Sequence, residues 1–189
     1  MKQRWKPGNM LYPLPAVLVT TRDKGGADNV LTIAWAGTIN TMPPMVSISV
    51  KKSRHSYKAL LETGVYVVNL TTEELSRAAD YCGVVSGRDK DKFEAMHLTK
   101  EEAAEINCPM IAESPVNIEC RVTEAKDLGS HTMFMAEVVA VHADDAYMDE
   151  TGRFNLNRAN PIVYSHGDYF TLGKKLGHFG WSVRKKRRG

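Results

Sequence analysis

The sequence predicts a mainly β fold with short helices, arranged as an antiparallel barrel or sandwich. Short β-branched stretches follow one another with turn residues between them, two longer strand patterns occupy the second half, and helix-prone segments are few. A doubly wound sheet would instead alternate strands with helices. No G-x-G-x-x-G follows a strand, so a Rossmann dinucleotide site is not supported.

The first half reads as short strands joined by turns. Residues 16–21 are rich in β-branched side chains and are followed by a hairpin-type connection at 22–26. Pro43 and Pro44 cannot sit in a sheet interior, so they separate two of the later strands. Those later strands are expected over residues 30–37, 46–51 and 65–70.

Three segments of this region favour helix. Residues 55–63 precede Gly64, a typical helix stop, and Thr72 with the acids after it resembles a capped helix start. Residues 86–106 are charged and helix-prone, and are expected to be the main insert that is not β.

The second half carries two long strand patterns. Apolar and polar residues alternate over 116–123, as in a half-buried strand. Residues 132–141 are almost wholly apolar, which predicts burial on both faces and a paired carboxylate at Glu137. A polar, turn-rich stretch over 143–161 leads to a last strand at 162–164.

Composition favours one compact domain over residues 1–183 with a basic tail at 184–189. The chain has 189 residues, of which 43% are hydrophobic, and no run of 18 apolar residues exists. The N-terminus lacks the apolar core of a secretory signal. Cys82, Cys108 and Cys120 are odd in number and far apart, so neither a disulfide framework nor a zinc site is suggested, and we expect a cytoplasmic protein.

The net charge of +3 arises from the tail. Residues 184–188 are all basic, and without them 20 basic side chains face 22 acidic ones. The charge distribution therefore does not suit a nucleic-acid-binding protein, because such proteins spread basic residues over a face. The tail is interpreted as a solvated terminus, with an electrostatic anchor for nucleic acid or an acidic partner as the alternative. The six histidines are scattered and no metalloprotease or EF-hand pattern occurs, so no metal site is expected.

An ordered set of segments resembles a known family. It comprises residues 29–35, the two prolines, and residues 47–57, 64–70, 86–93 and 131–138, and the likeness ends near 169–173. In this order the chain resembles the flavin reductase-like family, which includes flavoredoxins and ferric reductases. The resemblance implies an FMN-binding split β-barrel, bound FMN, NAD(P)H as reductant and a homodimer.

The turn after the strand at 46–51 suits the flavin phosphate. A phosphate needs hydroxyl and amide donors with one or two cations where a chain turns into a helix. Lys51, Ser53, Arg54, His55 and Ser56 supply these groups. A helix-capping turn with ordinary surface charges is the alternative.

The flavin ring needs a flat apolar slot lined by backbone amides. Thr32, Ile33, Ala34, Trp35 and Ala36 would provide it, with the Thr32 hydroxyl as a donor to the ring or ribityl chain. Trp35 is equally well interpreted as a core aromatic. The family pattern adds further flavin-lining positions, namely Asn29, Ser49, Val50, Asn69, Arg88 and Lys92.

Several of these positions have competing interpretations. Asn69 suits a structural hydrogen bond better than a flavin contact, and the basic segment around Arg88 and Lys92 suits a solvated helix start as well as a site mouth. His131 stands where the family has its histidine, and it is the candidate catalytic residue that would orient the nicotinamide or stabilise reduced flavin. Tyr164 and Tyr169 are candidates to close the pocket or an interface.

Together these features predict an NAD(P)H-dependent flavin or ferric reductase. A flavoredoxin-type carrier that holds FMN and is reduced by a protein partner is the main alternative. A pyridoxine phosphate oxidase is a weaker one, because no second basic cluster suits that substrate.

Overall fold

The computed structural model describes residues 1–183, so the predicted basic tail lies outside the described residues. Twelve strands and three α-helices are assigned in this part of the chain. The strands are β1 (Leu14–Pro15), β2 (Val17–Arg22), β3 (Asp28–Ile33), β4 (Ala36–Thr41), β5 (Pro44–Lys51), β6 (Val65–Asn69), β7 (Lys100–Glu102), β8 (Pro109–Ile111), β9 (Val116–Asp127), β10 (His131–Ala143), β11 (Ile162–Ser165) and β12 (Asp168–Thr171). The helices are α1 (Ser56–Thr63), α2 (Ser76–Val84) and α3 (Lys92–Ala95).

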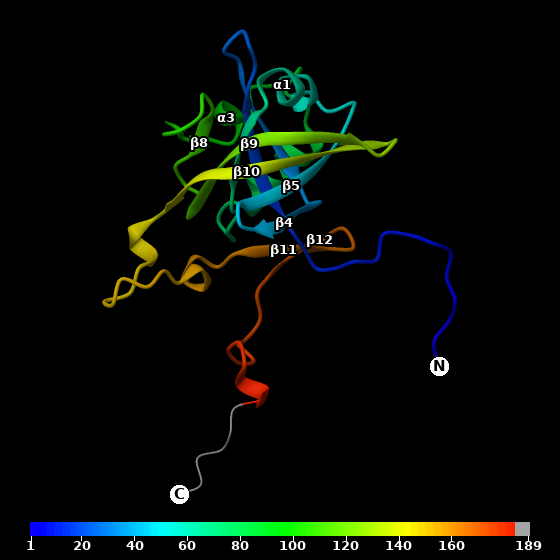
Figure 1. Cartoon of the computed structure of the whole chain (residues 1–189), viewed down its shortest axis with the longest axis vertical. Helices are drawn as coiled ribbons and strands as arrows, with labels where there is room; N and C mark the ends of the chain where they lie inside the picture. The colour runs from blue at the N-terminus through cyan, green and yellow to red at the C-terminus, as the bar shows by residue number, and fades with distance from the viewer. Residues whose placement is uncertain (184–189) are drawn as a thin grey trace, which may run out of the picture.

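The fold is the mainly antiparallel β architecture that the sequence predicts. Seven strands form one sheet in the order β3-β2-β6-β9-β10-β5-β4, and every pair in it is antiparallel. Two small sheets, β1-β11-β12 and β7-β8, complete the fold. Figure 1 shows β11 and β12 below β4 in this view, and the N-terminal segment extending away from the body.

The large sheet curls because its two edge strands are neighbours in the chain. β3 ends at Ile33 and β4 begins at Ala36, yet these strands stand at opposite ends of the sheet order. Only Ala34 and Trp35 connect them, a span of about 11 Å at most. The two edges therefore meet at this connection, which we call the seam.

The main core lies inside the curled sheet. Large side chains from four elements are fully or almost fully buried there, including Ile48, Leu60, Tyr66 and Phe134. Burial of this apolar surface is the main stabilising contribution to such a fold. α2 and α3 cover a second cluster against β2 and β3, around Leu18 and Phe93.

Most sequence-predicted strands are confirmed, with differences at their ends. The helix expected over 55–63 is α1, and Gly64 ends it with a left-handed φ of 66°. The strand expected over 30–37 is divided by the seam into β3 and β4. Thr72 lies one turn before α2, where its hydroxyl accepts from the Leu75 amide at 3.3 Å.

Two expectations about burial and helix content are wrong. Residues 86–106 contain one four-residue helix, α3, and then β7, which pairs with β8. β10 is buried on one face through Thr132, Phe134 and Ala136, whereas Glu137 on the other face is exposed and needs no ion pair. No helix in residues 1–183 is long and apolar enough to cross a membrane.

Candidate functional site

Two adjoining cavities follow the face of β3 that carries Leu31 and Ile33. The seam cavity, about 430 Å³, surrounds Ala34 and Trp35. The turn cavity, about 280 Å³, lies over the connection between β5 and α1. Lys51, Arg54 and Val84 line both cavities. The two cavities therefore form one groove with an apolar end at the seam and a cationic end at the turn.

The seam provides a flat aromatic wall with open backbone groups. Trp35 is 40% exposed, and its ring packs on the His131 imidazole with centroids 4.4 Å apart and planes tilted by 38°. Its carbonyl accepts from the Ser49 amide at 2.9 Å. Within residues 1–183 the amides of Ala34 and Trp35 have no hydrogen-bond partner. Trp35 is thus a cavity wall and not a core aromatic.

The other residues predicted at the ring end take different places. Thr32 lines the seam cavity, but its hydroxyl donates to the Ala79 carbonyl of α2. Ile33 is buried in the core and reaches the cavity with one edge. Ala36 lines a separate hollow under the N-terminal segment, and Ser49 lies between that hollow and the seam cavity.

The turn between β5 and α1 gathers several donors, and among residues 1–183 the side chains of Lys51, Ser53 and His55 have no hydrogen-bond partner. No side chain caps the N-terminus of α1, and its first turn holds no acidic residue. An uncapped helix start attracts an anion through its free amides and its partial positive charge. Arg54 makes one hydrogen bond, from Nη1 to the Gly83 carbonyl at 2.8 Å. Lys51, Ser53 and His55 line the turn cavity beside it.

Two residues predicted here serve the fold instead. The Val50 side chain is fully buried in the core, and Val50 lines neither cavity. Ser56 is 1% exposed, and its hydroxyl bonds Thr21 Oγ1 at 2.8 Å and the Asn29 amide nitrogen at 2.7 Å. Asn29 itself lines the turn cavity.

The loop after α2 lines the turn cavity with Gly87 and Arg88. Lys92 is 4% exposed, and its Nζ donates to the Val30 carbonyl at 2.7 Å and the Cys82 carbonyl at 3.0 Å. Burial lowers the pKa of Lys92, and the nearby Arg54 lowers it further. An ammonium has three donors, so Lys92 retains one beyond these two carbonyls.

His131 begins β10, lines the seam cavity and pairs with Lys51 of β5. Its Nδ1 lies 2.9 Å from Ser130 Oγ. Burial lowers the pKa of His131, and the charges of Lys51 and Arg54 lower it further. The imidazole is therefore biased toward its neutral form.

Asn69 lies in the core, away from both cavities. It is fully buried, donates to the Leu18 carbonyl at 2.9 Å, and accepts from the Ile111 amide at 3.0 Å and the Asn117 amide group at 2.7 Å. These bonds join β2, β6, β8 and β9, which is the structural interpretation.

Sequence reasoning missed the wall that α2 provides. Asp80, Gly83 and Val84 line the seam cavity, and Tyr164 and Tyr169 from the β11–β12 hairpin face them. The α2 residues carry no motif, and only the spacing of three to four residues on one helix face could have grouped them. Within residues 1–183 no group of three potential metal ligands occurs.

Comparison with known proteins places this geometry in a family. The model of the "Flavin reductase like domain" matches residues 9–173. The structure is similar to flavoredoxin of Desulfovibrio vulgaris (Miyazaki F), with a TM-score of 0.90, 27% identity and coverage of 97% of this chain and 100% of that one.

Two further relatives agree. Flavoredoxin from Methanosarcina acetivorans has a TM-score of 0.86 at 27% identity, covering 97% of this chain and 100% of that one. A flavin reductase (NADH) of Kitasatospora aureofaciens is 31% identical over 130 residues, 68% of this chain and 65% of that protein. The protein therefore has the split-barrel fold, and it belongs to the flavin reductase-like family.

Proposed function

We propose that the protein binds FMN in the groove along β3 and uses it as an NAD(P)H-dependent flavin or ferric reductase. The proposal is supported by the two different ends of the groove. An aromatic seam with open amides is continuous with an uncapped, cationic strand-to-helix turn. An amphipathic ligand with a flat ring and a terminal phosphate is complementary to both ends.

The residues present fit this ligand. At the turn, Lys51, Arg54 and Arg88 supply positive charge, and the amides at the start of α1 supply donors. At the seam, the Ala34 and Trp35 amides suit the polar edge of the ring. The small side chain of Ala34 allows the ring to approach the backbone.

The bound flavin would supply the hydride-accepting and electron-transferring chemistry. The chain's own residues bind and orient. Trp35 and His131 form a wall that excludes water from the seam cavity, and the neutral His131 imidazole can place an N–H against a reduced nicotinamide. Such transfer needs stacking and exclusion of water rather than an acid–base dyad.

A spectroscopic titration tests the proposal. FMN added to the purified protein should show quenched fluorescence, and NADH or NADPH added without oxygen should bleach the visible flavin absorbance. Lys51→Ala should weaken FMN binding about tenfold, as expected for a lost charge-assisted hydrogen bond. Lys126→Ala, an exposed lysine on β9, is the matched control. Absence of FMN binding by the folded protein would overturn the proposal.

A non-catalytic electron carrier is the second candidate. The likeness to two flavoredoxins over almost the whole chain favours it. In that case NADH and NADPH leave the FMN complex coloured, whereas a reduced redox protein bleaches it. Bleaching by either nucleotide at a steady turnover decides for the reductase.

We also propose that the protein forms a homodimer. Leu11, Leu176 and Phe179 in the two terminal segments are 82% exposed or more. Apolar side chains exposed in such numbers mark an interface. Light scattering of the full chain should give twice the 21.1 kDa mass of one chain, and a monomer at micromolar concentration would contradict it.

A further inference from the structure

A third cavity lies beyond the turn cavity, in line with the groove. The hairpin cavity, about 370 Å³, lies between the β2–β3 turn and α1. It shares Asn29, His55 and Arg88 with the turn cavity. Along β3, Ile33 borders the seam cavity, Leu31 borders the turn cavity, and Asn29 borders both the turn cavity and the hairpin cavity. Alternate residues of a strand share one face, so the three cavities follow one another in a row.

The boundary between the last two cavities is a tight contact. A Cβ added to Gly87 would overlap Asn29 Oδ1 and would lie 2.7 Å from His55 Cδ2. The backbone of Gly87 therefore packs directly against both side chains. Three separate elements meet here: β3, the turn before α1 and the loop after α2.

Hydrogen bonds on the protein side of this contact fix Asn29 in place. The Asn29 amide nitrogen donates to Ser56 Oγ at 2.7 Å, and Ser56 Oγ bonds Thr21 Oγ1 at 2.8 Å. Asn29 is 8% exposed and Ser56 is 1% exposed. Buried, hydrogen-bonded side chains of this kind are costly to displace. Asn29 is thus fixed in place from the protein side, and the exposed His55 side chain completes the boundary beside it.

We propose that Asn29, His55 and Gly87 form the end wall of the flavin site and make it select FMN over FAD. This inference rests on the proposed function and names the residues that restrict the site to FMN. FMN ends in a phosphate monoester, which fits a closed end. FAD continues through a second phosphate to an adenosine, and the wall blocks its path into the hairpin cavity.

Charge favours the same ligand. A phosphate monoester carries nearly two negative charges at neutral pH, whereas each phosphate of a dinucleotide carries one. The positive side chains of Lys51, Arg54 and Arg88 line the turn cavity immediately before the wall. The wall thus holds the more highly charged group against these cations.

Separate titrations with FMN and FAD test whether the end wall selects between the two flavins. FMN and FAD are titrated separately into the wild type, His55→Ala and Asn29→Ala, with flavin fluorescence as the readout. The wild type should bind FMN at least tenfold more tightly than FAD. Each substitution opens the wall, so the ratio of the two dissociation constants should fall at least fivefold, with FAD binding gaining in absolute terms. His97→Ala and Asn40→Ala, exposed residues outside all three cavities, should keep the wild-type ratio.

The ratio separates the wall from its alternatives. Loss of a phosphate contact at His55 would weaken both flavins and leave the ratio unchanged, and an unchanged ratio in both variants overturns the proposal. Equal binding of FMN and FAD by the wild type also overturns it, while the proposed function stands. If neither flavin binds the wild type, the proposed function itself fails. Should Asn29→Ala fail to fold, the exposed His55 still provides the test.

Discussion

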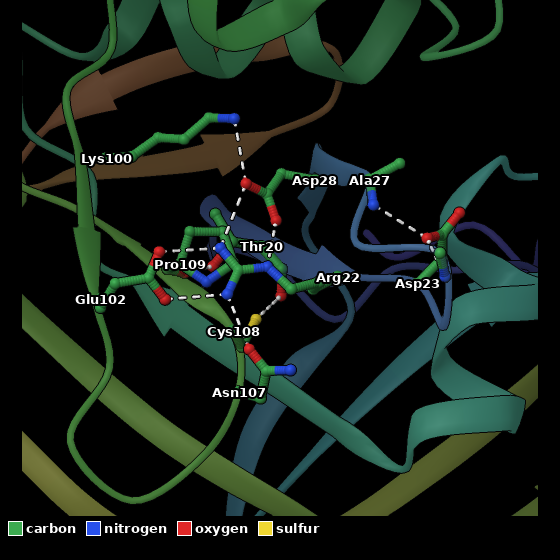
Figure 2. Close-up of polar contacts among 11 residues, drawn as sticks. Thr20, Arg22, Asp23, Ala27, Asp28, Lys100, Glu102, Asn107, Cys108 and Pro109 are labelled. Atoms are coloured by element: carbon green, nitrogen blue, oxygen red, sulfur yellow. Dashed lines mark hydrogen bonds and ion pairs between the residues drawn. The ribbon is translucent and has the colours of Figure 1, made fainter.

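Two charged clusters of this protein use their donors in opposite ways. Figure 2 shows the first, which we call the Arg22 network and which ties the β2–β3 hairpin to β7. Arg22 donates twice to Asp28, at 2.7 and 3.3 Å, and twice to Glu102, at 2.8 and 2.9 Å. Its fifth N–H donates to Asn107 Oδ1 at 2.7 Å, and Lys100 bonds Asp28 at 3.0 Å. A guanidinium has five donors, so all of them are used.

The second cluster is the cationic end of the groove along β3. Among residues 1–183, the side chains of Lys51, His55 and Arg88 have no hydrogen-bond or ion-pair partner, and Arg54 has one. A saturated cluster stabilises the fold, whereas a cluster with spare donors can bind an external anion. The number of charges does not separate the two clusters, but the use of their donors does.

The pKa values carry the same contrast. The hydrogen bonds that Arg22 donates to Glu102 and Asp28 raise its pKa. Burial alone would raise the pKa of Asp28, but Arg22 and Lys100 outweigh it and lower the pKa. In the groove, burial lowers the pKa of His131, and the unneutralised charges of Lys51 and Arg54 add to the effect. The network cancels its charge, and the groove remains positive.

The largest expected effect is on stability, from Arg22→Ala. The substitution leaves the mostly buried Asp28 with only Lys100, so the free energy of unfolding should fall by about 3 kcal/mol. Urea denaturation measures this, and the FMN dissociation constant should not change. Lys52→Ala removes the pair with Asp127 and should have a much smaller effect, because both side chains are exposed to solvent. A large loss of FMN affinity in Arg22→Ala would contradict the distinction between the clusters.

The next effect is on binding, from Arg54→Ala. Loss of a charged donor should weaken FMN binding roughly thirtyfold, or about 2 kcal/mol, with little change in the denaturation midpoint. Arg121→Ala is the matched control, because Arg121 also makes one bond to a backbone carbonyl, that of Glu105 at 3.3 Å, but lines neither cavity of the groove. Equal affinities of the two variants would remove Arg54 from the site.

Local signals explain which parts of the fold the sequence predicts. α1 is predictable because Gly64 stops it, and the polar turn before it stands out among apolar strands. β7 is not predictable, because the charged residues of Lys100–Glu102 favour helix and only their pairing with Pro109–Ile111 makes a strand. Tertiary pairing here overrides local propensity.

The same distinction applies to the site. Residue type and position predict Lys51 and Arg54 as phosphate ligands, and both residues line the groove. The side of the seam cavity that Gly83 and Asp80 line depends on how α2 packs against β3, and residue types alone do not show this packing. Thr32 illustrates the limit, because a hydroxyl at the predicted ring site is already bonded to α2.

A smaller effect tests this assignment of the Thr32 hydroxyl. Thr32→Val keeps the shape and leaves the Ala79 carbonyl without its donor, so the free energy of unfolding should fall by about 1 kcal/mol. FMN affinity should change less than about threefold, because the Thr32 hydroxyl bonds α2 and the substitution removes no hydrogen bond to the ligand. Calorimetry on the variant measures both quantities. A tenfold loss of affinity without destabilisation would show that the hydroxyl serves the flavin instead.

The smallest effect is the pH dependence of stability in the flavin-free protein. His131 has a pKa below its ordinary 6.5 in the folded chain, whereas the unfolded chain keeps the ordinary value. As pH falls through 6.5, the unfolded state takes up the proton first, so this residue's contribution lowers the free energy of unfolding until the folded pKa is passed. His131→Gln should flatten this part of the profile measured by urea denaturation, and His97→Gln should not.

Saturation with FMN places negative phosphate beside Lys51 and Arg54, which removes part of the charge that lowers the His131 pKa. A wild-type profile identical to that of His131→Gln would mean that the positive groove does not act on this imidazole.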